Sequence, residues 1–146
     1  MKAKICLAGP SRELERVRHW AAMLDRSGLF EFTHRWWLSY DQGGHVVGAD
    51  ALLLLDERKS IASNCMVAIV RADIVWALWP DTATSEGVPF ETAYAIGRAI
   101  HIVCSSTRIA GSVFATAGHE AFDSDAAAFE NVLRWARLPE QWRRRT

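Results

Sequence analysis

Short apolar runs alternate along the chain with longer segments in which apolar residues recur every three or four positions. A short apolar run bounded by glycine, proline or polar residues is typical of a buried strand, and the longer recurrence is typical of a helix with one buried face. The elements that these patterns predict are, in chain order, a strand at 4–8, a helix at 11–28, a strand at 29–37, a helix at 50–70, a strand at 74–79, a helix at 90–99, a strand at 100–104 and a helix at 125–137. Gly28 is expected to end its helix, and residues 105–118 are expected to be irregular apart from a short apolar piece at Val113–Phe114.

The alternation of strands and helices predicts a parallel sheet with helices on both faces. A length of 146 residues suits one domain. We therefore expect a single-domain, three-layer α/β sandwich over residues 1–146, with a Rossmann-like or flavodoxin-like parallel sheet of about five strands. Ligands of such sheets bind beyond the carboxyl ends of the strands, a rule that selects the loops at 9–11 and 80–87.

Charge and cysteine content narrow the classes of partner. The chain has 17 Lys and Arg residues and 17 Asp and Glu residues, so it offers no broad attraction to nucleic acid or to an anionic membrane. No apolar run reaches the ~18 residues of a membrane span, and the first residues lack the pattern of a secretion signal. Three cysteines without a CxxC pair argue for a reducing cytoplasm and against a disulfide framework or a zinc site. We therefore expect a cytoplasmic protein without a metal.

The first of the two loops contains Gly9, Pro10 and Ser11. Gly9 would let the backbone come close to a ligand, and a helix that begins near Ser11 would present free N–H groups to a phosphate. The same residues also suit an ordinary turn from a strand to a helix. Neither a Walker loop nor a GxGxxG dinucleotide motif is present. His34, near the end of a predicted strand, is a further residue that could contact a ligand.

The second loop contains more candidate chemistry. Ser85 can cap the helix that follows or donate a hydrogen bond to an anion, and Gly87 permits a close backbone approach. Glu91 falls about one turn into that helix, among largely apolar neighbours. A carboxylate in this place is either a solvated helix residue or a partly buried group of an active site, and the residues alone leave both interpretations open. Cys6 and Cys104 are expected to be small core residues.

Three segments together resemble the nucleoside 2-deoxyribosyltransferase superfamily. They are ICLAGPS at 5–11, ADIV at 72–75 and GVPFETAYAIGRAI at 87–100. The pattern is most similar to that of the 2′-deoxynucleoside 5′-phosphate N-hydrolases, and the resemblance extends over residues 4–136. It implies the α/β fold already expected from the alternation of strands and helices.

The resemblance also implies an activity. In that family a glutamate attacks C1′ of the sugar and expels the base, and the motif carries this role onto Glu91. Transferases acting on nucleosides place an aspartate six residues before the glutamate, where Ser85 stands in this chain. A neutral residue there favours a nucleoside 5′-monophosphate, whose phosphate end would be held by Gly9, Pro10, Ser11, Ser85 and Gly87. No cofactor is implied.

Two positions depart from the family's pattern. Cys6 stands where the family usually has a tyrosine, and Cys65 stands where it has an aspartate, eight residues before Asp73. A thiol cannot replace a carboxylate at neutral pH unless its pKa is strongly lowered. Either another acid such as Asp56 or Glu57 takes this place, or cleavage is slow or lost. Asp73 itself is expected to be structural.

Three functions therefore stay open. The first is an N-glycosidase of a nucleoside 5′-monophosphate. The second is a nucleoside 2-deoxyribosyltransferase, against which Ser85 argues, and the third is a non-catalytic nucleotide-binding or sensor protein, which Cys65 favours. The resemblance further implies a homodimer or a higher homo-oligomer in which Ser112 or Phe114 completes a neighbour's pocket.

Overall fold

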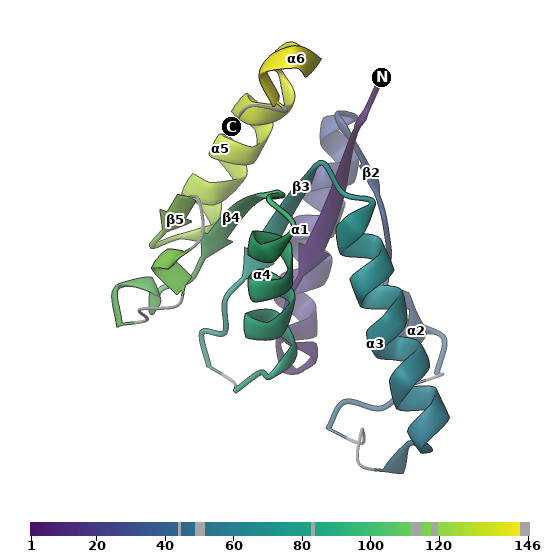
Figure 1. Ribbon diagram of the computed structural model, residues 1–146. Helices are drawn as coiled ribbons and strands as arrows, with labels where there is room; N and C mark the ends of the chain where they lie inside the picture. Colours follow the sequence, from purple (N-terminus) through teal and green to yellow (C-terminus); the bar gives the residue numbers. More distant parts are fainter. Residues whose placement is uncertain (44, 49–51, 83, 112–114, 118–119, 144–146) are drawn as a thin grey trace.

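Parallel strands form the centre of the computed structural model, which describes residues 1–43, 45–48, 52–82, 84–111, 115–117 and 120–143. Within these residues the sheet has five strands in the order β2-β1-β3-β4-β5, and every neighbouring pair is parallel (Figure 1). The strands are β1 (Ala3–Ala8), β2 (Phe30–Phe32), β3 (Ile74–Leu78), β4 (His101–Ser105) and β5 (Glu120–Phe122).

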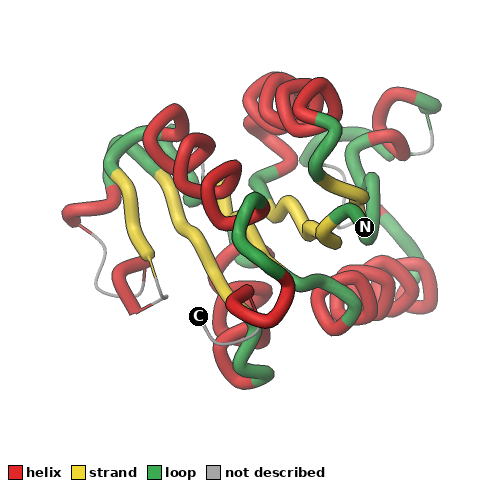
Figure 2. The backbone as a smooth tube through the Cα atoms, turned by 90° about the horizontal axis from the view of Figure 1, so that it is seen from above, coloured by secondary structure: helices red, strands yellow, loops and turns green. Residues whose placement is uncertain are grey.

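Helices cover both faces of this sheet, which makes three layers (Figure 2). The long helices are α1 (Leu14–Ser27), α3 (Leu55–Val70), α4 (Gly87–Gly97) and α5 (Asp125–Ala136). Shorter pieces are the helices α2 (Leu38–Asp41) and α6 (Glu140–Arg143) and the 3-10 turns η1 (Ser11–Glu13), η3 (Ile109–Gly111) and η4 (Ala115–Ala117). The predicted fold class, a three-layer α/β sandwich with a parallel sheet, is confirmed.

Alternate residues of β1 and β3 supply two separate cores. Ile5, Leu7 and Trp76 pack with the apolar sides of α1 and α5, whereas Cys6 and Val75 pack with α3 and α4. All five residues of β3 are buried, because this central strand is covered by helices on both faces. The apolar run that predicted β3 is therefore the pattern of a strand buried on both sides.

Several element boundaries differ from the prediction for physical reasons. The predicted strand at 29–37 ends at Phe32, because Trp36 and Trp37 belong to a turn in which the Trp36 indole donates to the Leu7 carbonyl (2.9 Å). The helix predicted at 90–99 begins at Gly87, since Pro89 is tolerated in a first turn that needs no backbone donor there. Gly28 ends α1 in the left-handed conformation, as predicted.

Two elements of the structure, β5 and η1, were not predicted from the sequence, and one predicted segment cannot be checked against the structure. The edge strand β5 is too short and mixed to give a pattern, and η1 precedes α1 as a separate turn. The predicted apolar piece at Val113–Phe114 lies outside the described residues.

Candidate active site

The carboxyl ends of β1 and β3 lie side by side, with Ala8 opposite Ala77. The chain leaves β1 toward β2 on one side and later returns to β3 on the other, so the strand order reverses between these two strands. Such a switch point is the usual ligand site of an open parallel sheet. Both loops selected from the sequence start here, the first at Gly9 and the second at Pro80.

Glu91 lies in the second turn of α4, on the side that meets α3 and β1. Its side chain is half-buried, and the Cys65 thiol of α3 lies close enough to its carboxyl group to influence its ionisation. Cys6 of β1 lies close enough to both groups to be influenced by their charge. Three elements that are far apart in the sequence thus place a carboxyl group and two thiols together.

Burial raises the pKa of Glu91 to about 7, and the nearby Cys65 thiol acts in the opposite direction. The pKa of Cys65 is raised to about 12, first by burial and then by the charge of Glu91. Burial, followed by the same charge, raises the pKa of Cys6 to about 12. At neutral pH both thiols are therefore uncharged, while Glu91 is poised between its acid and its carboxylate. A carboxyl group tuned in this way is typical of catalytic sites.

Ser85 and Gly87 lie where α4 begins. The Ser85 hydroxyl accepts a hydrogen bond from the Val88 N–H (3.3 Å), so it caps the first turn of the helix. A hydroxyl that accepts a bond still has its own proton to donate. A Cβ added to Gly87 would meet only the Ser85 oxygen at 4.0 Å, so the space in front of this backbone is open. The beginning of α4 can therefore be approached closely by a ligand.

The first loop has a packing role that the sequence did not reveal. A Cβ added to Gly9 would lie 2.7 Å from a methyl group of Val17, which is fully buried in α1. Glycine is thus required here to seat α1 against the end of β1. Pro10 is buried, and Ser11 is half-buried at the start of η1. These three residues border the switch point on the side of β1.

The acids considered as substitutes for the missing aspartate lie elsewhere. Asp56 and Glu57 are exposed in the first turn of α3, and Glu57 accepts a hydrogen bond from the Leu54 N–H (2.7 Å). Cys65 is eight residues beyond Glu57 along that helix, which corresponds to about 12 Å of rise. The hypothesis that either acid takes the place of the family's aspartate is therefore not supported by the geometry.

Asp73 directly precedes β3, at the amino-terminal ends of the strands and thus at the opposite end of the sheet from Ser85 and Gly9. There its carboxylate accepts a hydrogen bond from the Lys4 N–H (2.8 Å). This contact agrees with the structural role expected for it. His34, just beyond β2, is half-buried, and burial lowers its pKa. Ser112 and Phe114 lie outside the described residues.

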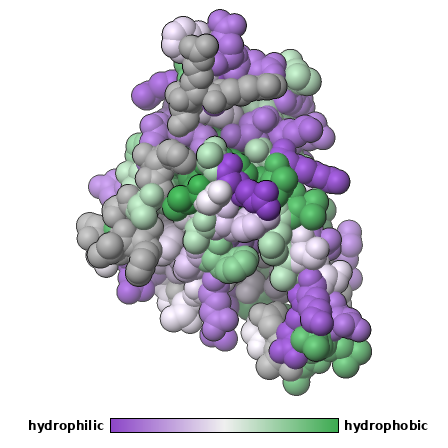
Figure 3. Space-filling view, in the orientation of Figure 1, coloured by the Kyte–Doolittle hydropathy of each residue, from purple (hydrophilic) through white to green (hydrophobic). Residues whose placement is uncertain are grey.

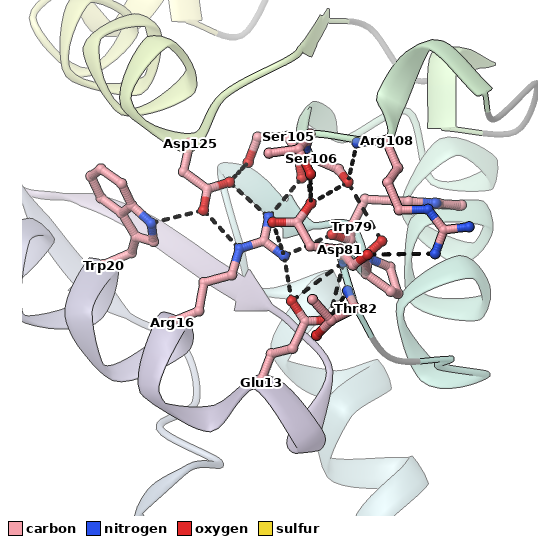
Figure 4. A network of polar contacts seen from close by, with 12 residues as sticks. Glu13, Arg16, Trp20, Trp79, Asp81, Thr82, Ser105, Ser106, Arg108 and Asp125 are labelled. Atoms are coloured by element: carbon pink, nitrogen blue, oxygen red, sulfur yellow. Dashed lines mark hydrogen bonds and ion pairs between the residues drawn. The ribbon is translucent and has the colours of Figure 1, made fainter.

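Sequence reasoning missed a polar network at the carboxyl ends of β3 and β4 (Figure 4). Arg16 of α1 donates to the Asp125 carboxylate through Nε (2.7 Å) and Nη2 (2.8 Å), and its Nη1 donates to Glu13 (3.0 Å). The backbone carbonyls of Trp79 and Ser105 accept further bonds from Arg16 at 2.8 and 3.1 Å. One guanidinium thus connects α1 and α5 to the ends of two strands.

The network continues into the start of the second loop. The Asp81 carboxylate accepts hydrogen bonds from the Ser106 hydroxyl (2.6 Å) and the Thr107 N–H (2.8 Å). The Asp81 N–H in turn donates to the Glu13 carboxylate at 3.1 Å. These bonds fix the base of the loop that leads to Ser85.

Ionisation within the network is set by its hydrogen bonds. Burial opposes the ionisation of Asp125, but hydrogen bonds from Arg16, Ser105 and Trp20 outweigh it and lower the pKa of that carboxyl group. Since Glu13, Asp81 and Asp125 all surround the guanidinium of Arg16, this residue acts as a clamp and not as a site for a phosphate.

None of the described helices is long and apolar enough to cross a membrane. No protein-family model matches the sequence, and no curated protein matches it.

Solved structures share the fold. A conserved protein from Enterococcus faecalis V583 is similar with a TM-score of 0.56 and 13% identity, over 92% of this chain and 96% of the other. The CMP N-glycosidase BcmB of Clostridium botulinum is similar with a TM-score of 0.53 and 15% identity, over 88% of this chain and 97% of the other. The chain therefore shares its overall α/β fold with a CMP N-glycosidase.

Proposed function

We propose that this protein is an N-glycosidase that hydrolyses the bond between base and sugar of a nucleoside 5′-monophosphate. The observation that carries the proposal is Glu91: a desolvated carboxyl group with a pKa of about 7, held beside the topological switch point of the sheet. The fold shared with a CMP N-glycosidase gives independent support for a nucleotide as the substrate.

The chemistry follows from the state of this carboxyl group. The carboxylate of Glu91 attacks C1′ of the sugar, and the bond from C1′ to the base breaks with its electron pair going to the base, which takes a proton from water. The sugar is then held as an ester of Glu91. Water attacks C1′, gives up a proton and releases the carboxylate. A desolvated carboxylate stabilises the positive charge that develops on the sugar more strongly than a solvated one does.

The phosphate end of the substrate is assigned to the beginning of α4. Ser85 is neutral and keeps a hydroxyl proton to donate, and the backbone at Gly87 is open to close approach. Gly9, Pro10 and Ser11 border the same region from β1. In this arrangement the sugar lies between the phosphate and Glu91, one turn along the helix.

The test is a panel of ribo- and deoxyribonucleoside monophosphates, with the free base followed by chromatography. Glu91→Gln should lower base release on the order of a thousandfold or more, because an amide of nearly the same shape cannot act as the nucleophile. Glu130→Gln is the matched control, since Glu130 is an exposed carboxylate of α5, on the opposite face of the sheet, and should keep wild-type turnover.

A Glu91→Gln protein with near-normal turnover would contradict the proposal. Calorimetric binding of a monophosphate by the wild type without any base release would favour the sensor function instead. Transfer of the sugar to an added free base in place of water would favour the transferase.

We also propose a second copy of the chain as partner, bound through the outer sides of α3 and α4. Val67, Val70 and Phe90 are 45%, 51% and 57% exposed, and a hollow of about 430 Å³ with Met66 and Tyr94 in its lining lies between the two helices. Figure 3, which looks onto this face, has apolar side chains spread across it. The outer sides of α1 and α5 are more polar, so a partner would cover the layer formed by α3 and α4.

A further inference from the structure

One carboxylate connects the two loops that border the candidate site. Glu13 ends η1, two residues after Ser11 in the first loop, and its side chain extends to the start of the second loop (Figure 4). There it accepts hydrogen bonds from the backbone N–H of Asp81 (3.1 and 3.3 Å) and from that of Thr82 (3.5 Å). The first loop follows β1 and the second follows β3, so Glu13 bridges the switch point of the sheet.

The surroundings of Glu13 hold its side chain in this position. The side chain is 8% exposed, so water competes little for its oxygens. Arg16 donates to it at 3.0 Å and is itself fixed to Asp125 by two hydrogen bonds. Hydrogen bonds between charged groups are stronger than those between neutral ones. The connection between the two loops is therefore a firm part of the fold.

The second loop has contacts at both of its ends. At its start the Asp81 carboxylate accepts hydrogen bonds from the Ser106 hydroxyl (2.6 Å) and the Thr107 N–H (2.8 Å). At its end the Ser85 hydroxyl accepts a hydrogen bond from the Val88 N–H. Because Ser85 precedes α4 and belongs to this loop, its place depends on the contacts at the start of the loop as well as on the helix.

We propose that Glu13 is a positioning residue for the phosphate end of the substrate: by accepting the Asp81 and Thr82 N–H groups, it holds the loop that contains Ser85 against the first loop before the substrate binds. This role rests on the function proposed above. Loops that are ordered on folding do not have to be ordered on binding, so the affinity for the phosphate is higher.

The charge of Glu13 would by itself act in the opposite direction. The carboxylates of Glu13, Asp81 and Asp125 surround the Arg16 guanidinium at the edge of the site assigned to a phosphate. A negative charge repels a phosphate, so the loss of a charge at position 13 without any movement of the loops should strengthen phosphate binding. The positioning role predicts weaker binding, and the sign of the change therefore separates the two effects.

Three substitutions at position 13 test the proposal. Glu13→Ala removes the acceptor. Glu13→Asp keeps the charge but is one methylene shorter, so its oxygens no longer reach the second loop. Glu13→Gln loses the charge and keeps one acceptor oxygen for the two N–H groups. Inorganic phosphate is titrated against the substrate-free protein and followed by NMR of the backbone amides. It should bind about tenfold more weakly to Glu13→Ala and Glu13→Asp, and within about threefold of wild type to Glu13→Gln.

Kinetics on the cleaved monophosphate and on its parent nucleoside give the second readout. In Glu13→Ala the KM for the monophosphate should rise about tenfold with kcat within about twofold, because the lost contact affects the bound substrate and the transition state alike. The KM for the nucleoside, which has no phosphate, should stay within about twofold. A substitution that only weakened the fold would affect both substrates equally.

Two controls lie on α1. Glu15→Gln removes an exposed carboxylate that pairs with Arg18 and does not touch the second loop. Trp20→Phe removes the indole N–H that donates to Asp125 (2.9 Å), so it weakens the same network away from the two loops. Both variants should keep wild-type phosphate binding and the wild-type ratio between the two substrates. Thermal melts confirm that each variant is folded.

The outcomes separate this inference from the function beneath it. Unchanged or stronger phosphate binding and an unchanged KM in a folded Glu13→Ala protein that still releases base would overturn the positioning role and leave the proposed function standing. An equal rise in KM for both substrates would overturn that role as well. Weaker phosphate binding in Glu13→Ala, with no base released by wild type across the whole panel, would support the positioning of a phosphate and overturn the proposed function. A wild type that neither binds phosphate nor releases base would overturn both.

Discussion

Glu91 is a residue that the fold stabilises poorly in its charged form. Its pKa is raised by burial to about 7 in the folded protein, from an ordinary value of 4.5. Below pH 4.5 the carboxyl group is neutral in both states and has no effect on folding. As pH rises toward 7 the unfolded chain loses this proton first, so the folded protein loses stability until Glu91 is itself ionised. The group needed for the proposed chemistry thus destabilises the fold at neutral pH.

Glu91→Gln should therefore stabilise the protein, and only at higher pH. The raised pKa corresponds to about 3 kcal/mol of unfolding free energy above pH 7.5, and the difference from wild type should fall to near zero at pH 4.5. Urea denaturation of both proteins at several pH values measures this. Glu130→Gln, which removes an exposed carboxylate of α5, is the control. Equal stability of Glu91→Gln and wild type at pH 8 would show that Glu91 is not desolvated.

Helix α4 combines a structural cap with the proposed phosphate site. Ser85 bonds the Val88 N–H at the first turn of the helix, and an aspartate in its place would cap the helix equally well and would face the positive end of the helix dipole. A negative charge at position 85 would therefore stabilise the helix but would repel the phosphate of the substrate. A substitution here can separate an effect on stability from an effect on substrate choice.

Ser85→Asp should keep the stability of the fold and lose the preference for monophosphates. Two negative charges about 4 Å apart at an effective dielectric constant of about 20 repel by about 4 kcal/mol, so kcat/KM for a monophosphate should fall by a hundredfold or more. Use of the parent nucleoside should change by only a few-fold. Ser85→Ala is the matched variant: it removes the cap, at a cost of about 1 kcal/mol in stability, and one donor to the phosphate, so the preference should weaken several-fold and not be lost. A parallel loss on nucleoside and monophosphate would refute the phosphate assignment.

The elements that the sequence predicted well are those buried by neighbours on both sides. Every residue of β3 and β4 is buried because helices cover both of their faces, and all but His101 and Ser105 are apolar. The segment after Phe32 has similar composition, yet Trp36 and Trp37 make it a turn, because their rings pack beside the core and Trp36 bonds the end of β1. Edge strand β5 is three residues long, which is too short for any periodicity to appear.

The residues of the candidate site likewise fall into two groups: those that a local sequence motif predicts, and those that depend on contacts between elements far apart in the sequence. Glu91, Ser85 and Gly87 follow from a motif within one loop and helix. The proximity of Cys65 to Glu91 depends on how α3 packs beside α4, and the clamp of Arg16 on Asp125 joins residues 109 positions apart. No spacing rule connects such partners, so they are visible only once the sheet order brings their elements together.

As a whole, the molecule has one layer of helices with a mostly polar outer surface and one layer whose outer surface exposes large apolar residues. Exposed large apolar residues gather on α3, on α4 and on the segment that leads into α3, as with Leu54, Val70 and Phe90. With 16 residues in α3 and two helices side by side, the face measures about 24 by 20 Å, so a symmetric pair would bury about 1,000 Å² in total, near the lower limit of a stable interface. Since the chain has no net charge, two copies do not repel one another.

Wild type should accordingly sediment as a dimer, at twice the 16.4 kDa of one chain, at tens of micromolar protein. Val70→Glu places a charge in the lining of the hollow within the proposed interface and should raise the dissociation constant at least about a hundredfold, because an unpaired charge would be buried in each copy. Ala126→Glu, an equal change on the exposed side of α5, should leave the dimer intact. Analytical ultracentrifugation across a dilution series distinguishes these cases, and circular dichroism checks that the variants are folded. A monomeric wild type, or a dimer indifferent to Val70→Glu, would place the partner surface elsewhere or remove it.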